Sequence, residues 1–413
     1  MEARSLRNKS LKIGFVLLAV TMLIAVFLFV SPMAVLAFSP EYVTWTEYPS
    51  NPVFDPPESA YYPSIIFSGS TYYMWYDDGG GIRYTTSVDG ISWVSGAICT
   101  GLTNARHPVV KWVGSGYRIW YWDSGGNLYY SINDIRTAVS PDGITWNSDR
   151  VIAQTGGATV IAGPGPYWNN GSYGPCEVFY NPAGSGAIVP PISAPTVWQN
   201  KFVMYYDGTT GSFEDIGIAV SADGITWQGY NNGAAPVLLH GGGSTWDSNY
   251  ATMCSVQKIN GLYHMWYSGG QSTSHEGIGY AQSLDGITWT KYTSNPIMHI
   301  SDSVSWRTDR TYTPRVLYDS ANFSGAGESV HLKMWYNGTS GSNYAIGYSG
   351  NNLPEPEPTT TTTPAAIGGQ VYPADKRAIL MPYIYVLISI NIIIIGGLVW
   401  KKLTFARTNR WKS

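Results

Sequence analysis

The chain has 413 residues and a formal net charge of −3, and its aromatic residues (14%) outnumber its charged residues (12%). Between its basic ends, residues 38–378 carry 15 Lys and Arg against 26 Asp and Glu, a balance that argues against a nucleic-acid partner. Three cysteines are too few for a disulfide framework in a chain this long. No metal-ligand spacing of Cys or His occurs, so we expect neither a metal nor a cofactor.

The first 37 residues read as a targeting segment. Four basic residues precede an apolar run over 13–30, and small residues follow up to Ala37. This pattern predicts a secretory signal that is cleaved after Ala37. Because the apolar run is long for a signal peptide, an uncleaved N-terminal anchor is the alternative.

Two short phrases recur through residues 41–350. An aromatic phrase of the form YxMWY occurs five times and begins at Tyr72, Tyr117, Phe202, Tyr263 and Leu332. A phrase of the form SxDGIxW occurs four times and begins at Ser87, Ser140, Ser221 and Ser283. Adjacent Asp and Gly favour a tight turn between strands, because Asp bonds the backbone ahead of it and Gly accepts positive φ.

The period of the repeat predicts radial sheets. Successive aromatic phrases lie 45 to 85 residues apart, which is enough for a four-stranded sheet with its loops. No useful length of residues 41–350 shows a helical period. We therefore predict an all-β fold, a five-bladed β-propeller over residues 38–352.

The ends of this region predict how the ring closes. Thr44–Phe54 matches Thr288–Met298 in seven of eleven positions, yet lacks the preceding strands of a unit of its own. The fifth unit, conversely, stops near Asn352 without its turn phrase. The N-terminal fragment is therefore expected to complete the last blade, which leaves no open sheet edge.

The C-terminal part predicts a membrane attachment. A Pro/Thr-rich stalk spans 353–378, and an uncharged apolar run over 379–400 is long enough to cross a bilayer as a transmembrane helix. Five basic residues follow within 401–413. The positive-inside rule places this tail in the cytoplasm and the propeller outside the cell, on a single-pass cell-membrane protein.

Taken together, these phrases resemble those of the five-bladed β-propeller glycoside hydrolases of the arabinanase, invertase and levansucrase type, families 43, 32 and 68, over about 310 residues. The resemblance implies three carboxylates at the channel mouth, each just before the first-strand Pro of blades one to three. Here those places read Tyr61-Tyr62-Pro63, Arg106-His107-Pro108 and Tyr173-Gly174-Pro175. The carboxylate triad that glycoside hydrolysis ordinarily uses is therefore missing at these places.

The first-strand segments contain one carboxylate, Glu177. In an apolar channel its pKa would be raised, as a general acid requires. The alternative is an ion pair with Arg106, Arg310 or Arg315 that holds blades together. His107 is a candidate acid or base and Tyr62 a candidate nucleophile, with hydrogen-bonded structural roles as their alternatives.

Further residues beside these strand starts are expected to contact a substrate, namely Arg106, Tyr173, Asp309 and Arg310. The Asp of each turn phrase is interpreted as a turn residue. Two function classes remain open: an enzyme that acts on glycans outside the cell, and a catalytically inactive propeller that binds carbohydrate or protein in adhesion or envelope structure.

Overall fold

The computed structural model describes residues 38–124, 134–154, 174–181, 202–209, 213–229, 235–271, 274–321, 323 and 330–351. The predicted signal (1–37), stalk (353–378), membrane helix (379–400) and cytoplasmic tail (401–413) lie outside these residues. Within the described part of the chain, no helix has the length and apolar character needed to cross a membrane.

Strands dominate the described residues, which otherwise include two 3₁₀ turns, η1 (Pro40–Tyr42) and η3 (Ile300–Asp302). The strands form five antiparallel units that we call blades. Blade 1 contains β2 (Tyr61–Ser68), β3 (Thr71–Asp77), β4 (Ile82–Ser87) and β5 (Ala97–Ile98). Blade 2 contains β6 (Ala105–Trp112), β7 (Tyr117–Asp123), β8 (Asp134–Ser140) and β9 (Asn147–Gln154). Blade 3 contains β10 (Gly174–Tyr180), β11 (Phe202–Thr209), β12 (Glu214–Ser221) and β13 (Trp227–Gly229).

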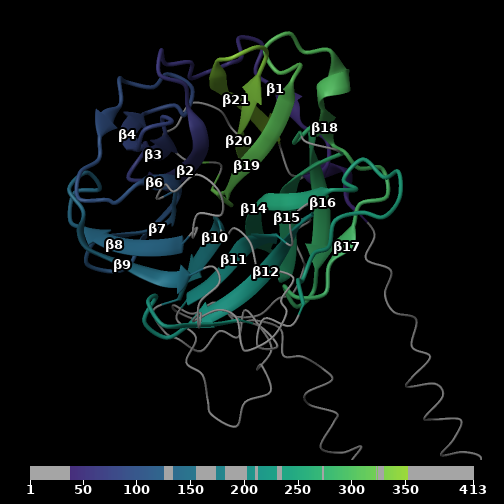
Figure 1. Ribbon diagram of the computed structural model, residues 1–413. Helices are drawn as coiled ribbons and strands as arrows, with labels where there is room; N and C mark the ends of the chain where they lie inside the picture. The colour runs from purple at the N-terminus through teal and green to yellow at the C-terminus, as the bar shows by residue number, and fades with distance from the viewer. Residues whose placement is uncertain are drawn as a thin grey trace, which may run out of the picture. The chain divides into compact units, whose positions relative to one another are not determined.

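Blade 4 contains β14 (Tyr250–Ile259), β15 (Leu262–Gly270), β16 (Gly277–Ser283), β17 (Thr290–Lys291) and β18 (Met298–His299). Blade 5 contains β19 (Arg310–Tyr318), β20 (Leu332–Thr339), β21 (Tyr344–Asn351) and β1 (Thr46–Glu47). The first strands β2, β6, β10, β14 and β19 lie innermost and each contacts the first strands of both neighbouring blades (Figure 1). The described residues thus confirm the all-β, five-bladed arrangement.

The turn phrases have the structure that their letters predict. In the Ser140–Trp146 phrase, the Asp142 carboxylate accepts hydrogen bonds from the amides of Ile144 and Thr145, each at 2.8 Å. These bonds lower the pKa of Asp142 to about 2. Gly143 has φ +79°, a conformation that suits glycine. Asp142 is therefore a turn residue, and Asp89, Asp223 and Asp285 form the same bonds.

The aromatic phrase joins each blade to the next. The Trp75 indole of blade 1 donates a hydrogen bond of 2.6 Å to the Gly143 carbonyl in the turn of blade 2. Equivalent bonds run from Trp120 to Gly224, from Tyr205 to Gly286 and from Trp335 to Gly90. Blade 5 lacks this turn, and Trp266 instead donates to the carbonyl of Tyr42 at 3.0 Å. The N-terminal segment thus completes the ring of bonds.

The N-terminal segment also supplies the outer strand of blade 5, because β1 pairs antiparallel with β21. The Asn51 side chain accepts from the Tyr348 amide at 2.8 Å and donates to the Tyr348 carbonyl at 2.9 Å. Asn295 makes the same two bonds to Tyr280 in blade 4. The predicted closure and the predicted internal copy are therefore confirmed by matching contacts.

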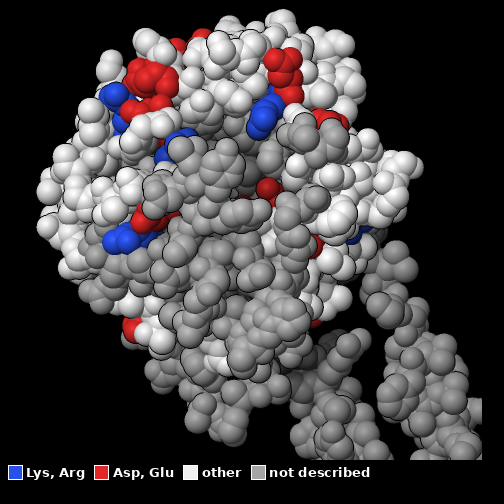
Figure 2. Space-filling model, viewed as in Figure 1, with Lys and Arg blue, Asp and Glu red and all other residues white. Residues whose placement is uncertain are grey.

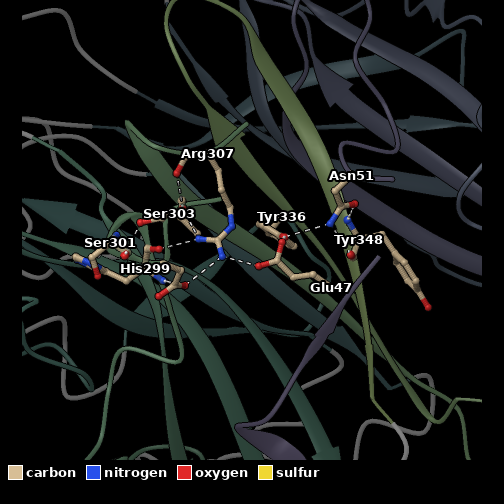
Figure 3. Close-up of polar contacts among 10 residues, drawn as sticks. Glu47, Asn51, His299, Ser301, Ser303, Arg307, Tyr336 and Tyr348 are labelled. Atoms are coloured by element: carbon tan, nitrogen blue, oxygen red, sulfur yellow. Dashed lines mark hydrogen bonds and ion pairs between the residues drawn. The ribbon is translucent and has the colours of Figure 1, made fainter. Parts of the chain in front are cut away.

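A buried arginine, Arg307, links the N-terminal strand β1 to the segment between blades 4 and 5 (Figure 3). Arg307, 1% exposed, forms ion pairs with Glu47 of β1 and with Asp302 of η3. Its guanidinium also donates to the His299 carbonyl at 2.8 Å, and Glu47 accepts from the Tyr336 hydroxyl at 2.8 Å. The first and last parts of the propeller therefore share one polar network.

Candidate functional site

The five innermost strands are bulged at the same level, just after they begin. Tyr62, His107, Met253 and Thr313 lie within the register shifts and have φ between 47° and 50°. In blade 3 the shift lies between Pro175 and Glu177. Positive φ is uncommon for residues other than glycine. Bulges next to functional sites often redirect a side chain. Of these residues, Tyr62, His107 and Met253 line the mouth of the central channel.

Four of the five bulges are held by the preceding blade. In each case the acceptor is a polar side chain on the second strand of a blade, directly after the two aromatic residues that end the aromatic phrase. It accepts a hydrogen bond from the backbone amide of the bulged residue in the next blade. The acceptor and donor pairs are Asp77 with His107, Asp207 with Met253, Ser268 with Thr313 and Asn337 with Tyr62. These clamps fix the inner strands against one another, since each satisfies a backbone donor that the bulge leaves outside the strand ladder.

A cavity of about 390 Å³ opens at this mouth. Its wall combines aromatic rings with polar and charged groups. The aromatic residues are Tyr61, Tyr62, Trp122, Tyr312 and Tyr344, and the polar ones include Arg106, His107, Asp207, Glu214, His275 and Arg310. The dimensions and the mixed lining are typical of a small-molecule or sugar site. We call it the mouth pocket.

The structure brings four of the predicted site residues together here. Tyr62 and His107 stack, with ring centroids 3.3 Å apart, and Trp122 lies 4.7 Å from His107. Burial lowers the pKa of His107 well below its usual value, and burial raises the pKa of Tyr62 well above its own. The imidazole is therefore neutral and the phenol protonated near pH 7. These states suit hydrogen bonding to a ligand better than nucleophilic attack by Tyr62.

The two predicted arginines of the pocket have different surroundings. Arg106 forms an ion pair with the buried Asp77 and donates to the Gly79 carbonyl at 3.1 Å. Burial raises the pKa of Asp77 in spite of this partner. The Arg310 guanidinium lines the pocket without a hydrogen bond or ion pair to any described residue. Arg310 is thus the guanidinium that can bind a ligand without breaking an existing pair.

One predicted contact residue, Asp309, lies outside the pocket. Asp309 is exposed, and its carboxylate accepts from the Gly341 amide at 2.8 Å rather than lining the pocket. Tyr173 lies outside the described residues.

Glu177 lies deeper in the channel and is 1% exposed. It pairs with Lys111 of blade 2 and Arg315 of blade 5, each at 2.7 Å. Burial raises its pKa, but Lys111 and Arg315 outweigh burial, so the pKa lies below its usual value. Arg315 also donates to the carbonyls of Cys176 and Pro63. This geometry favours the ion-pair interpretation, in which Glu177 joins blade 3 to blades 2 and 5, over proton donation.

Sequence reasoning missed Asp207, Glu214 and His275. Asp207 is buried on β11, and its Oδ1 accepts from the Met253 amide and the Cys176 thiol, each at 2.8 Å. Burial raises the pKa of Asp207 to about 7. The Glu214 carboxylate lies 3.5 Å from His275 Nε2. The available signal for Asp207 was the polar residue that directly follows four of the five aromatic phrases.

Comparison with known proteins identifies the fold. No protein-family model and no curated protein matches the chain. A solved glycoside hydrolase is 15% identical, with 73% of this chain and 91% of that chain covered, at a TM-score of 0.53. A solved BT0996 RGII complex is 15% identical over 72% and 88%, at a TM-score of 0.52. A putative glycosidase of Bacteroides thetaiotaomicron is 13% identical over 75% and 98%, at 0.51. The protein has the fold of the propeller glycoside hydrolases.

Proposed function

We propose that this protein acts on or binds a glycan in the mouth pocket. One observation carries the proposal: the pocket sets aromatic faces beside hydrogen-bonding groups at one mouth of the channel. Sugar rings stack on flat aromatic faces, and their hydroxyls need partners that donate and accept. A neutral imidazole (His107) and a protonated phenol (Tyr62) each do both. The fold shared with a solved glycoside hydrolase and a putative glycosidase supports the same substrate class.

The surface charge is consistent with a glycan rather than a polyanion. Figure 2 shows that on the viewed face the few Lys and Arg atoms lie beside Asp and Glu atoms. Extended basic surfaces are what nucleic acids require. The expectation of no nucleic-acid partner therefore remains part of the proposal.

The proposed location is the outer surface of the cell membrane. The apolar run 379–400 and the basic residues after it support this orientation. Protease added to intact cells is then expected to release the propeller and to spare the 401–413 tail. A protected propeller with a cleaved tail would reverse the proposed topology.

A glycan array on the purified full-length chain tests the ligand class. The informative variant is Trp122→Ala, which removes one aromatic face of the mouth pocket. Its matched control is Trp112→Ala in the same blade, since Trp112 is 48% exposed and lies in a separate cavity. We expect Trp122→Ala to weaken binding of any glycan hit about tenfold, because one stacking contact is lost. Equal effects of the two variants would place the ligand elsewhere, and an array without hits would contradict the proposed ligand class.

A further inference from the structure

We propose that Asp207 is the proton donor of a glycoside-hydrolysing site in the mouth pocket, with Glu214 as the base that activates water. This inference rests on the proposed glycan site and goes beyond it. It places the catalytic carboxylates on the second and third strands of blade 3, not before the first-strand prolines where the family resemblance implied them.

The fold does not need a carboxylate at residue 207. Asp207 holds the Met253 amide as one of the four clamps, and the clamps at the equivalent positions of blades 4 and 5 use Ser268 and Asn337. A neutral acceptor therefore satisfies the bulged amide. The carboxyl group of Asp207 needs another explanation.

No cationic side chain among the described residues neutralises the Asp207 carboxylate. Asp207 is 9% exposed and forms no ion pair with any described residue, whereas Asp77 at the equivalent position of blade 1 pairs with Arg106. An ionised carboxylate without a counter-ion is costly to bury, so the group instead keeps its proton. The raised pKa agrees with this geometry. Buried acids of this kind cluster at functional sites.

The second oxygen of Asp207 is directed toward the pocket wall. Oδ1 is occupied by Met253 and Cys176, whereas a Cβ built on Gly174 would lie 3.3 Å from Oδ2 and 3.7 Å from His107 Nδ1. Gly174 lines the mouth pocket, and because it has no side chain, Asp207 Oδ2 and the His107 ring both lie beside the pocket wall at this point. A ligand atom that enters there comes within reach of the acid.

Glu214 lies on the same face of the sheet as Asp207. Asp207 pairs with Ile216 and Thr209 pairs with Glu214, so Asp207 and Glu214 are diagonal neighbours across β11 and β12. The Cα atoms of diagonal neighbours are about 7–8 Å apart, which lets two side chains on one face hold their carboxyl groups at a similar separation. Inverting glycosidases hold their two carboxyl groups about 6.5–9.5 Å apart, which leaves room for a water molecule. The Glu214 side chain is 30% exposed, so water can reach it.

The reaction step consumes one water molecule. Glu214 takes a proton from that water while the water oxygen bonds to the anomeric carbon. The bond from the anomeric carbon to the leaving oxygen breaks, and this oxygen takes the proton of Asp207. Asp207 ends as a carboxylate and Glu214 as a carboxylic acid, and exchange with solvent restores both.

The test measures hydrolysis of each glycan that the wild-type protein binds. Asp207→Asn keeps the clamp acceptor, as Asn337 shows, but has no acidic proton. We expect turnover to fall about 10²-fold or more while glycan affinity stays unchanged. A dinitrophenyl glycoside, whose leaving group needs no proton, is expected to restore turnover in Asp207→Asn but not in Glu214→Gln. The matched control is Asp319→Asn, which lies in a separate cavity and is expected to leave turnover unchanged.

The outcomes separate this inference from the proposed function. Binding without wild-type hydrolysis, or full turnover by Asp207→Asn, would overturn the catalytic assignment and leave the glycan site standing. Absence of binding would overturn the glycan site itself. NMR of the first-formed sugar is expected to show inversion at the anomeric carbon, and retention would overturn the role of Glu214 as base.

Discussion

Replacing Asp207 with Asn is expected to change how stability depends on pH. The folded chain holds the proton of Asp207 with a pKa of about 7, against 3.8 for an ordinary Asp. Between these values the unfolded chain releases a proton that the folded chain keeps, so the free energy of unfolding falls as pH rises through this range. Roughly three pH units at about 1.4 kcal/mol each give a loss of about 4 kcal/mol. Asn does not titrate and therefore avoids this loss.

Urea unfolding of both proteins at pH 4, 6 and 8 measures the difference. The groups that face Asp207 do not titrate with it: burial raises the pKa of the Cys176 and Cys254 thiols and lowers that of His107, so these three stay neutral. Glu214, whose charge also acts on Asp207, is common to both proteins. We expect Asp207→Asn to gain stability relative to wild type as pH rises from 4 to 8. Parallel stability curves would refute a protonated, unpaired Asp207.

Two further changes test structural contacts, and a third tests the glycan site. Glu177→Gln leaves the buried Arg315 and the partly exposed Lys111 without their carboxylate and is expected to cost about 3–5 kcal/mol, seen as a lower Tm. An unchanged Tm would argue against the ion-pair role. Deleting 38–55 removes β1 and opens the β21 edge, so we expect a loss of several kcal/mol in thermal unfolding, and an unaltered melting curve would contradict the closure. Arg310→Gln is expected to weaken glycan binding roughly 10- to 100-fold in titration calorimetry, the value of a charged hydrogen bond, whereas unchanged affinity would remove Arg310 from the site.

The repeat phrases made the fold predictable because each phrase encodes a complete local structure. The Ser140–Trp146 phrase contains the hydroxyl, carboxylate and glycine that its turn uses. The match between Thr44–Phe54 and Thr288–Met298 predicted the closure because Asn51 and Asn295 bond to equivalent strands. A short sequence phrase was therefore sufficient to predict a structure whose hydrogen bonds lie within the phrase or recur in each repeat.

The site was predicted in part, for a physical reason. Tyr62, Arg106, His107 and Arg310 were found because strand starts meet at one mouth of a propeller. Asp207 was missed because its second-strand position matched that of Asn337, and the sequence does not show which polar residues after the aromatic phrase have a counter-ion. The partners of Glu177 come from two other blades, so its role depended on contacts between distant segments.

The most direct test of the glycan site is a crystal structure of the full-length protein with an oligosaccharide that it binds. We predict a sugar ring in the mouth pocket, against Tyr62 or Trp122, with its glycosidic oxygen within hydrogen-bonding distance of Asp207 Oδ2. An oligosaccharide bound elsewhere, with the mouth pocket free of sugar, would contradict the account.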